Sequence, residues 1–206
     1  MLDKNNLEVQ LWVEEFREKL VGADVVFGFD IDNTLSVGQL RTQYKDCPKY
    51  LELKEEQYKS YTSELGFLIN PYDFREPHRE CLEQFASLLK ETNGVAVCVS
   101  SWVMSLNARS SNEVAVKSVP EMIDDIFAFE FGCWPKGKVV GGLICGDINR
   151  GVDLKDALSS IGVEKPLVVI DDAAHRYTDK RYAYNVDGRT GLTKSDVENI
   201  KQMLKV

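Results

Sequence analysis

The sequence predicts an α/β protein in which a mainly parallel sheet is covered by helices on both faces. The first observation is that apolar runs of β-favouring residues alternate with amphipathic helical patterns. The runs and patterns occupy, in chain order, residues 5–20, 25–29, 76–92, 95–99, 153–161, 165–170 and 193–204. The second is that two runs end in paired acids, Asp30/Asp32 and Asp171/Asp172. Parallel strands that are buried on both faces read as continuous apolar runs, and ligands bind beyond their carboxyl ends.

The other segments are assigned by weaker signals. Residues 120–131 predict a helical turn followed by a strand near 126–131. The Gly-rich stretch 132–151 indicates a loop or hairpin, and residues 182–186 a short final strand. Residues 36–75 match no clear pattern. They are too few for a large independent domain, but enough for a small cap or flap over the paired acids; an irregular surface excursion is the alternative. We therefore expect one domain over residues 1–206, with a small insertion at about 38–75.

Composition narrows the function classes. The chain has 206 residues, 44% hydrophobic and 28% charged, which is ordinary for a globular protein. The absence of a long apolar run or a basic leader predicts a cytoplasmic protein without membrane association. The five Cys residues, with no C-x-x-C spacing, are read as reduced thiols and not as a disulfide frame or zinc site. A net charge of −8 disfavours avid, non-specific binding to duplex nucleic acid.

The chemistry is concentrated at three predicted strand ends, which close with Asp30, Ser100 and Asp171. In a parallel sheet these ends open onto one crevice, so several carboxylates and a hydroxyl should meet there. An oxygen-only set of ligands selects Mg²⁺ over zinc or copper. Beside such an ion a carboxylate can attack phosphorus, a second carboxylate can act as general acid and base, and a lysine can stabilise the developing charge.

The segment Asp30-Ile31-Asp32-Asn33-Thr34 after its apolar run resembles the first motif of the haloacid dehalogenase (HAD)-like superfamily of phosphohydrolases. The resemblance implies a Rossmann-like three-layer α/β/α fold with a small cap. It implies that Asp30 is the nucleophile that forms an aspartyl-phosphate, and that Asp32 is the general acid and base, with its backbone carbonyl on the metal. Thr34 is assigned to the substrate phosphate.

Three later motifs extend the resemblance over most of the chain. Ser100 is similar to the second motif, a hydroxyl that binds a phosphate oxygen, with Ser101 as its rival. Lys155 is similar to the third, a lysine on the helix before the last acid-tipped strand, and is preferred to Lys136 and Lys138 because a helix positions a charge better than a Gly-rich loop. Asp171 and Asp172 resemble the fourth motif, the acid pair that holds the metal.

The finer resemblance points in two directions. Lys-Asp-Ala-Leu before Val-Val-Ile-Asp-Asp is similar to small-cap phosphatases that act on the tail of RNA polymerase. Ser-Ser-Trp and the segment Thr190–Thr193 look more like microbial phosphatase domains associated with RNA repair.

The resulting expectation is a Mg²⁺-dependent phosphomonoesterase with Asp30, Asp32, Asp171 and Asp172 around the metal. The substrate is a phosphorylated small molecule, a nucleotide or a nucleic-acid end; a phosphoprotein is the other option, and the oligomeric state is open. A phosphotransferase of the same fold and a non-catalytic phosphate-binding protein are the alternatives. Selectivity is assigned to residues 36–75 and 132–151.

Overall fold

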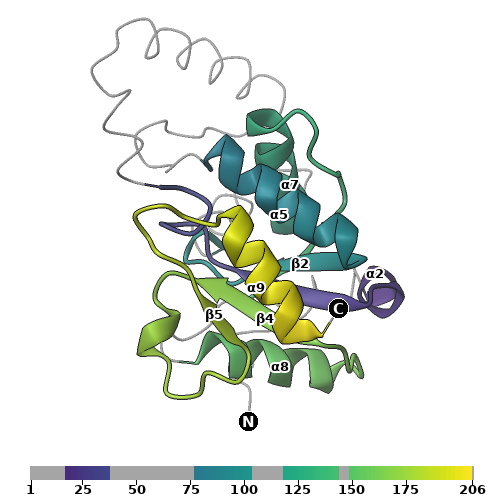
Figure 1. The fold of residues 1–206 in the computed structure, drawn as a ribbon. Coiled ribbons are helices and arrows are strands. Elements are labelled where there is room, and N and C mark those ends of the chain that lie inside the picture. The colour runs from purple at the N-terminus through teal and green to yellow at the C-terminus, as the bar shows by residue number, and fades with distance from the viewer. Residues whose placement is uncertain (1–16, 38–76, 104–117, 144–148, 206) are drawn as a thin grey trace, which may run out of the picture.

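The computed structural model describes residues 17–37, 77–103, 118–143 and 149–205 (Figure 1). In chain order its elements are α2 (Arg17–Gly22), β1 (Val25–Phe29), α5 (Arg79–Glu91), β2 (Gly94–Cys98), α7 (Val119–Glu130), β3 (Val139–Gly142), α8 (Arg150–Ser160), β4 (Leu167–Asp171), the 3₁₀ helix η2 (Ala174–Arg176), β5 (Ala183–Asn185) and α9 (Lys194–Leu204). The expected insertion at about 38–75 lies outside the described residues, as does most of the expected helix over 5–20.

The five strands form a single parallel sheet in the order β3-β2-β1-β4-β5. This arrangement confirms the predicted α/β class and is Rossmann-like. The central strand β1 pairs with β2 on one side and with β4 on the other. The direction in which the chain adds strands therefore reverses between β1 and β4. Open α/β sheets bind ligands at such a switch point, beyond the carboxyl ends of the strands.

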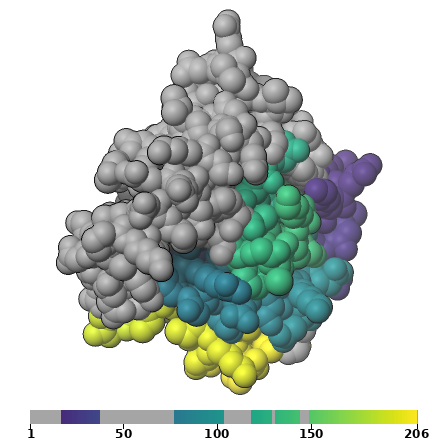
Figure 2. Space-filling view, turned by 90° about the horizontal axis from the view of Figure 1, so that it is seen from above, coloured from purple at the N-terminus to yellow at the C-terminus, as the bar shows by residue number. Residues whose placement is uncertain are grey.

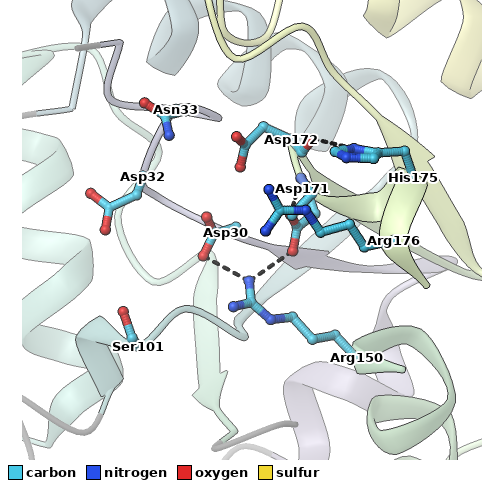
Figure 3. Close-up of a pocket in the computed structure, with 10 residues that line it drawn as sticks. Asp30, Asp32, Asn33, Ser101, Arg150, Asp171, Asp172, His175 and Arg176 are labelled. Carbon is cyan, nitrogen blue, oxygen red and sulfur yellow. Dashed lines mark hydrogen bonds and ion pairs between the residues drawn. The ribbon is translucent and has the colours of Figure 1, made fainter. Parts of the chain in front are cut away.

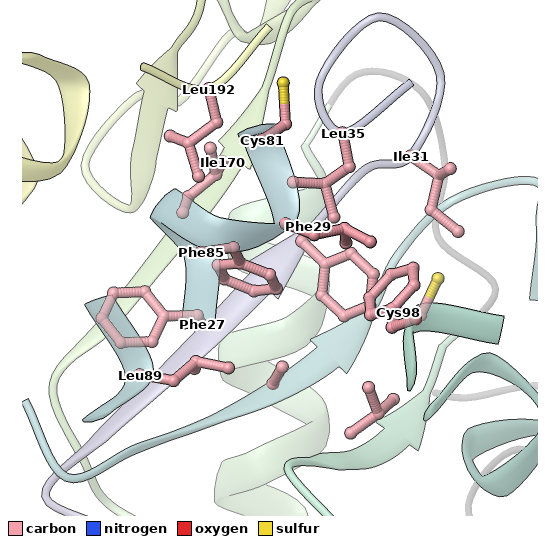
Figure 4. Packing of buried hydrophobic residues seen from close by; sticks show 14 of the residues in the cluster. Phe27, Phe29, Ile31, Leu35, Cys81, Phe85, Leu89, Cys98, Ile170 and Leu192 are labelled. Atoms are coloured by element: carbon pink, nitrogen blue, oxygen red, sulfur yellow. The ribbon is translucent and has the colours of Figure 1, made fainter. Parts of the chain in front are cut away.

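Helices cover both faces of the sheet. On one face, α5, α7 and α9 pack against the odd-numbered side chains of β1, and Phe29 contacts both Phe85 and Phe127 with ring centroids 5.2 and 5.6 Å apart (Figure 4). Figure 2 shows α5, in teal, lying between α9, in yellow, and the green residues of α7. On the other face, Leu20 of α2 and Leu154 of α8 pack against Val26. Every residue of β1, β2 and β4 is buried, as the continuous apolar runs predict.

A glycine in β1 brings α8 close to the sheet. The chain leaves β3 at one edge and returns as β4 beyond β1, so α8 crosses beneath β1. A Cβ atom at Gly28 would lie 2.6 Å from Val169 Cγ2 and 2.9 Å from Leu154 Cδ2. Only a residue without a side chain fits between β4 and the helix at this point.

Three element assignments from the sequence are corrected. Residues 126–131 are not a strand, because α7 runs without a break from Val119 to Glu130. Ser118 and Glu121 form a capping box at its start, and the helical spacing of Ile123, Ile126 and Phe127 buries one side. The stretch 132–151 contains the parallel strand β3 and is not simply a loop or hairpin. Helix α8 begins at Arg150, so Asp153 lies inside its first turn and Asn149 is the N-cap.

No helix in the described part of the chain is both long and apolar enough to cross a membrane.

Candidate active site

A pocket of about 360 Å³ lies at the switch point between β1 and β4 (Figure 3). Its walls come from the turn after β1, the turn after β2, the first residue of α8 and the loop after β4. These segments are far apart in the sequence and meet because parallel strands present their carboxyl ends at one edge of the sheet.

Three carboxylates converge in this pocket. Oxygen atoms of Asp30, Asp171 and Asp172 all lie within 4.8 Å of one another. Asp30 follows β1 directly, Asp171 is the last residue of β4, and Asp172 is the next residue. Asp171 is fully buried and Asp30 is 6% exposed. Three carboxylates held so close repel one another and lose hydration, so a positive charge nearby would stabilise their ionised forms.

Arg150 supplies part of that charge. Its Nη1 donates to Asp30 Oδ1 at 2.9 Å and to Asp171 Oδ2 at 2.7 Å, and only 13% of its side chain is exposed. Arg150 is the first residue of α8, and helices of a parallel sheet begin at the edge where the strands end. The guanidinium therefore bridges β1 and β4 from the helical layer beneath them.

Asp171 accepts three hydrogen bonds. Its Oδ2 accepts from Arg150 and from the buried Tyr177 hydroxyl, and its Oδ1 accepts from the backbone N–H of Ala173 at 2.7 Å. Tyr177 is 3% exposed, and burial followed by the hydrogen bond to Asp171 raises the pKa of its hydroxyl. Asp171 therefore serves first as the anchor of Arg150, and Asp30 and Asp172 have more oxygen capacity left for a metal ion.

The pKa values of Asp30 and Asp172 are raised in this buried cluster. Burial, and then the charge of Asp171, raise the pKa of Asp30 to about 7, although Arg150 and a hydrogen bond from Ser100 oppose the rise. Burial and Asp171 also raise the pKa of Asp172, while a hydrogen bond from Asn33 lowers it. A cation bound between the two would favour their charged forms.

Asp32 lies apart from the three-carboxylate cluster. It lines the same pocket and is partly exposed, and Figure 3 shows its carboxylate separated from those of Asp30 and Asp172. The turn that carries it is tight, with Ser36 N–H bonded to Ile31 O at 2.8 Å and Asn33 at a φ of 58°. Asparagine tolerates this left-handed conformation better than most residues. The turn sets Asp32 beside the pocket without adding a fourth acid to the cluster.

The three predicted phosphate-binding hydroxyls differ in position. Ser101 is exposed and lines the pocket. Ser100 is 2% exposed and hydrogen-bonds to Asp30, so it contacts an acid of the pocket without lining the pocket itself. Thr34 is fully buried, and its hydroxyl accepts the backbone N–H of Asp172 at 3.1 Å. The structure thus places Thr34 in the link between the two acidic turns and not in the pocket wall.

Lys155 is not brought to the pocket. Its amine pairs with Glu164, on the loop that precedes β4. Lys155 follows Arg150 by five helical positions, which moves it about 7.5 Å along the axis and about 140° around it. The two other lysines that were considered are also remote from the pocket. Lys138 Nζ donates to Gly94 O, at the start of β2, and Lys136 Nζ lies 3.7 Å from Asp125 Oδ1. The cation found at the carboxylates is Arg150.

Sequence reasoning missed five polar residues of this region: Asn33, Arg150, His175, Arg176 and Tyr177. Arg150 falls in the Gly-rich stretch 132–151, for which the sequence predicts a loop or hairpin, whereas helix α8 begins at this residue. His175, Arg176 and Tyr177 follow the Asp171/Asp172 pair by three to six positions. Residues in a short turn directly after an acid-tipped strand stay near the carboxyl end of that strand. Their closeness in sequence to Asp171 and Asp172 therefore indicates that they lie at the pocket.

The donor set fits a magnesium ion. The three clustered groups are carboxylates, the type of ligand that Mg²⁺ prefers. Burial first, and then the charge of Asp171, raise the pKa values of Asp30 and Asp172, and a cation bound between the carboxylates would favour their charged forms.

No family model, no curated protein and no solved structure matches this chain.

Proposed function

We propose that this protein is a Mg²⁺-dependent phosphomonoesterase of the HAD-like superfamily that works through an aspartyl-phosphate on Asp30. The observation that carries the proposal is the meeting of Asp30, Asp171 and Asp172 with Arg150 at the switch point of a parallel sheet. Such a site combines a nucleophile, hard-cation ligands and a fixed positive charge, which are the groups that phosphoryl transfer needs.

The metal would be held by Asp30, Asp172 and the backbone carbonyl of Asp32, with Asp171 in support. When bound, Mg²⁺ would neutralise charge on the phosphate oxygens and on the attacking carboxylate. Arg150 would add a second positive charge. Its two hydrogen bonds to carboxylates fix the guanidinium beside Asp30, where charge develops in the transition state.

The chain's own residues account for the bond changes. An oxygen of the Asp30 carboxylate forms a bond to phosphorus while the bond from phosphorus to the ester oxygen breaks. The Asp32 carboxyl group gives its proton to the leaving oxygen. Asp32, now ionised, takes a proton from water as that water attacks phosphorus, which releases inorganic phosphate and restores Asp30. Ser101, which lines the pocket in the turn after β2, would contact the phosphate oxygens, and the buried Ser100 would hold Asp30 through its hydrogen bond.

Turnover of p-nitrophenyl phosphate by the purified protein tests the proposal. We expect hydrolysis with Mg²⁺, none with excess EDTA, and recovery when Mg²⁺ is added back. Full activity in excess chelator would rule out the metal. A protein that binds phosphate esters but turns over none would be a non-catalytic binder. Transfer of the phosphoryl group to an added sugar or nucleoside, in preference to water, would instead identify a phosphotransferase.

A further inference from the structure

Arg176 differs from the other arginines of the described segments. Within this part of the chain, its guanidinium makes no hydrogen bond, ion pair or ring contact. Each of the other five has a partner: Arg17 binds Ile161 O, Arg79 lies over the Phe131 ring, Arg150 binds Asp30 and Asp171, Arg181 pairs with Asp179, and Arg189 pairs with Asp187.

This arginine lines the pocket. It belongs to η2, which follows the Asp171/Asp172 pair after one residue, and it is exposed. In Figure 3 its side chain extends from the loop after β4 toward the acids. His175 lines the same wall, with Nδ1 3.1 Å from Asp172 O and 3.2 Å from Asn185 Oδ1. The two residues therefore add a basic wall beside the acidic centre.

We propose that Arg176, beside His175, binds a second phosphate group of the substrate. This inference rests on the proposed function, in which the first phosphate is the one transferred from the ester to Asp30. Arg150 is committed to the first phosphate, because its Nη1 donates to Asp30 and Asp171 and holds the guanidinium beside the nucleophile. An accessible guanidinium that pairs with no carboxylate of the described segments matches the geometry of a phosphate, to which it can donate two parallel hydrogen bonds. The substrate class is therefore a phosphomonoester that carries another phosphate.

The pocket favours a small bisphosphorylated molecule over a nucleic-acid end. Its volume of about 360 Å³ is at the lower end for small-molecule sites. A net charge of −8 repels a long polyanion, whereas the guanidinium of Arg176 attracts a compact one locally.

A series of α,ω-alkanediol bisphosphates of increasing length, each compared with its own monophosphate, provides the test without assuming a spacing. For the best length we expect kcat/KM of the bisphosphate to exceed that of the monophosphate by about tenfold or more, well above the statistical factor for two reactive ends. Arg176→Ala should reduce this ratio to nearly the statistical value. Arg181→Ala, which removes an exposed arginine outside the pocket wall, should leave the ratio unchanged. A ratio near the statistical value at every length in the wild type, or a ratio that Arg176→Ala does not lower, would overturn the proposal.

Binding measured by calorimetry separates this inference from the proposed function. If no ester is turned over, the phosphatase proposal fails. The second phosphate site is still supported if the wild type binds bisphosphate about tenfold more tightly than monophosphate and Arg176→Ala binds the two equally. Equal binding of the two in the wild type rejects it. A 3′-phosphorylated tetranucleotide is the last probe. If Arg176→Ala weakens binding of this tetranucleotide by a larger factor than it weakens binding of any diol bisphosphate, the proposal of a small-molecule substrate is wrong.

Discussion

Arg150 joins two carboxylates at the ends of different strands, and this contact favours Arg150 over Lys155 as the charge-stabilising group. Lys155 matched the expected order of motifs, but a residue's place on a helix decides where its charge goes. The first residue of α8 reaches the edge of the sheet where β1 and β4 end, and a residue five positions later does not. Charge stabilisation at phosphorus should therefore depend on Arg150.

Arg150→Ala should lower kcat by about 10²–10³, the loss typical of one charge-stabilising group. Lys155→Ala removes an amine that pairs with Glu164, so it should retain activity close to that of the wild type. Steady-state kinetics of both variants with p-nitrophenyl phosphate, and circular dichroism to confirm folding, give the comparison. A severe loss in Lys155→Ala together with an active Arg150→Ala would restore the assignment made from the sequence.

Asp30→Asn should reduce turnover by at least about 10³-fold while the fold persists, because an amide cannot form the acyl-phosphate. The substitution keeps the size of the side chain and can still accept the hydrogen bond from Arg150. Single-turnover assays with quench at acid pH measure the loss, and Asp156→Asn, on the exposed side of α8, is the matched control. Asp30 is not the nucleophile if Asp30→Asn keeps more than a few per cent of the wild-type rate.

At the scale of elements, long periodic segments and strongly buried strands could be predicted, and short or edge elements could not. Strands β1, β2 and β4 read as apolar runs because both of their faces are covered. The edge strand β3 contains Gly141 and Gly142, residues that are depleted in strands, and only tertiary pairing with β2 reveals it. The error at 126–131 arose because isoleucine and phenylalanine favour strands, while the capping box at Ser118 had already started a helix.

Packing between β1 and α8 links stability to the site. Gly28 lies two residues before Asp30, and Leu154 lies one turn after Arg150 on α8. Gly28→Ala would force Val169 or Leu154 to move, and overpacking of this kind costs about 1–3 kcal/mol. Because α8 carries Arg150, the same substitution should also lower kcat.

Urea unfolding and steady-state kinetics of Gly28→Ala test this link, with Gly132→Ala as control. A Cβ at Gly132 meets nothing within 4 Å, so that variant should change stability by less than about 0.5 kcal/mol. A Gly28→Ala protein with unchanged stability and rate would show that the contact is easily relieved.

At the scale of the whole molecule, the parallel order of strands is what assembles the site. Sequence patterns predicted that Asp30, Ser100 and the Asp171/Asp172 pair would meet, and they do. The same patterns could not show how the acids divide their tasks. That Asp171 anchors Arg150, or that Thr34 ties the two acidic turns together, depends on side-chain hydrogen bonds that cross between strands.

The cluster also predicts how metal binding and pH act on the stability of the protein. Burial, and then the charge of Asp171, raise the pKa of Asp30 from its ordinary value of 3.8 to about 7 in the folded protein. The folded state therefore binds the proton more tightly than the unfolded state does. Without metal, the contribution of Asp30 to stability is fully present below pH 3.8 and is lost as the pH rises to about 7. The raised pKa of Asp172 acts in the same direction.

Mg²⁺ should reverse this loss, because it binds the ionised carboxylates and competes with the proton. We expect the increase in Tm caused by 10 mM Mg²⁺ to be larger at pH 8 than at pH 5.5, where Asp30 holds its proton. Differential scanning fluorimetry at the two pH values measures it, with NaCl at matched ionic strength to account for simple screening of the net charge of −8. Asp172→Asn should lower the increase in Tm at pH 8, whereas Asp187→Asn, which alters an exposed acid paired with Arg189, should not. If NaCl reproduces the effect, or if the increase is the same at both pH values, the carboxylates do not form the metal site.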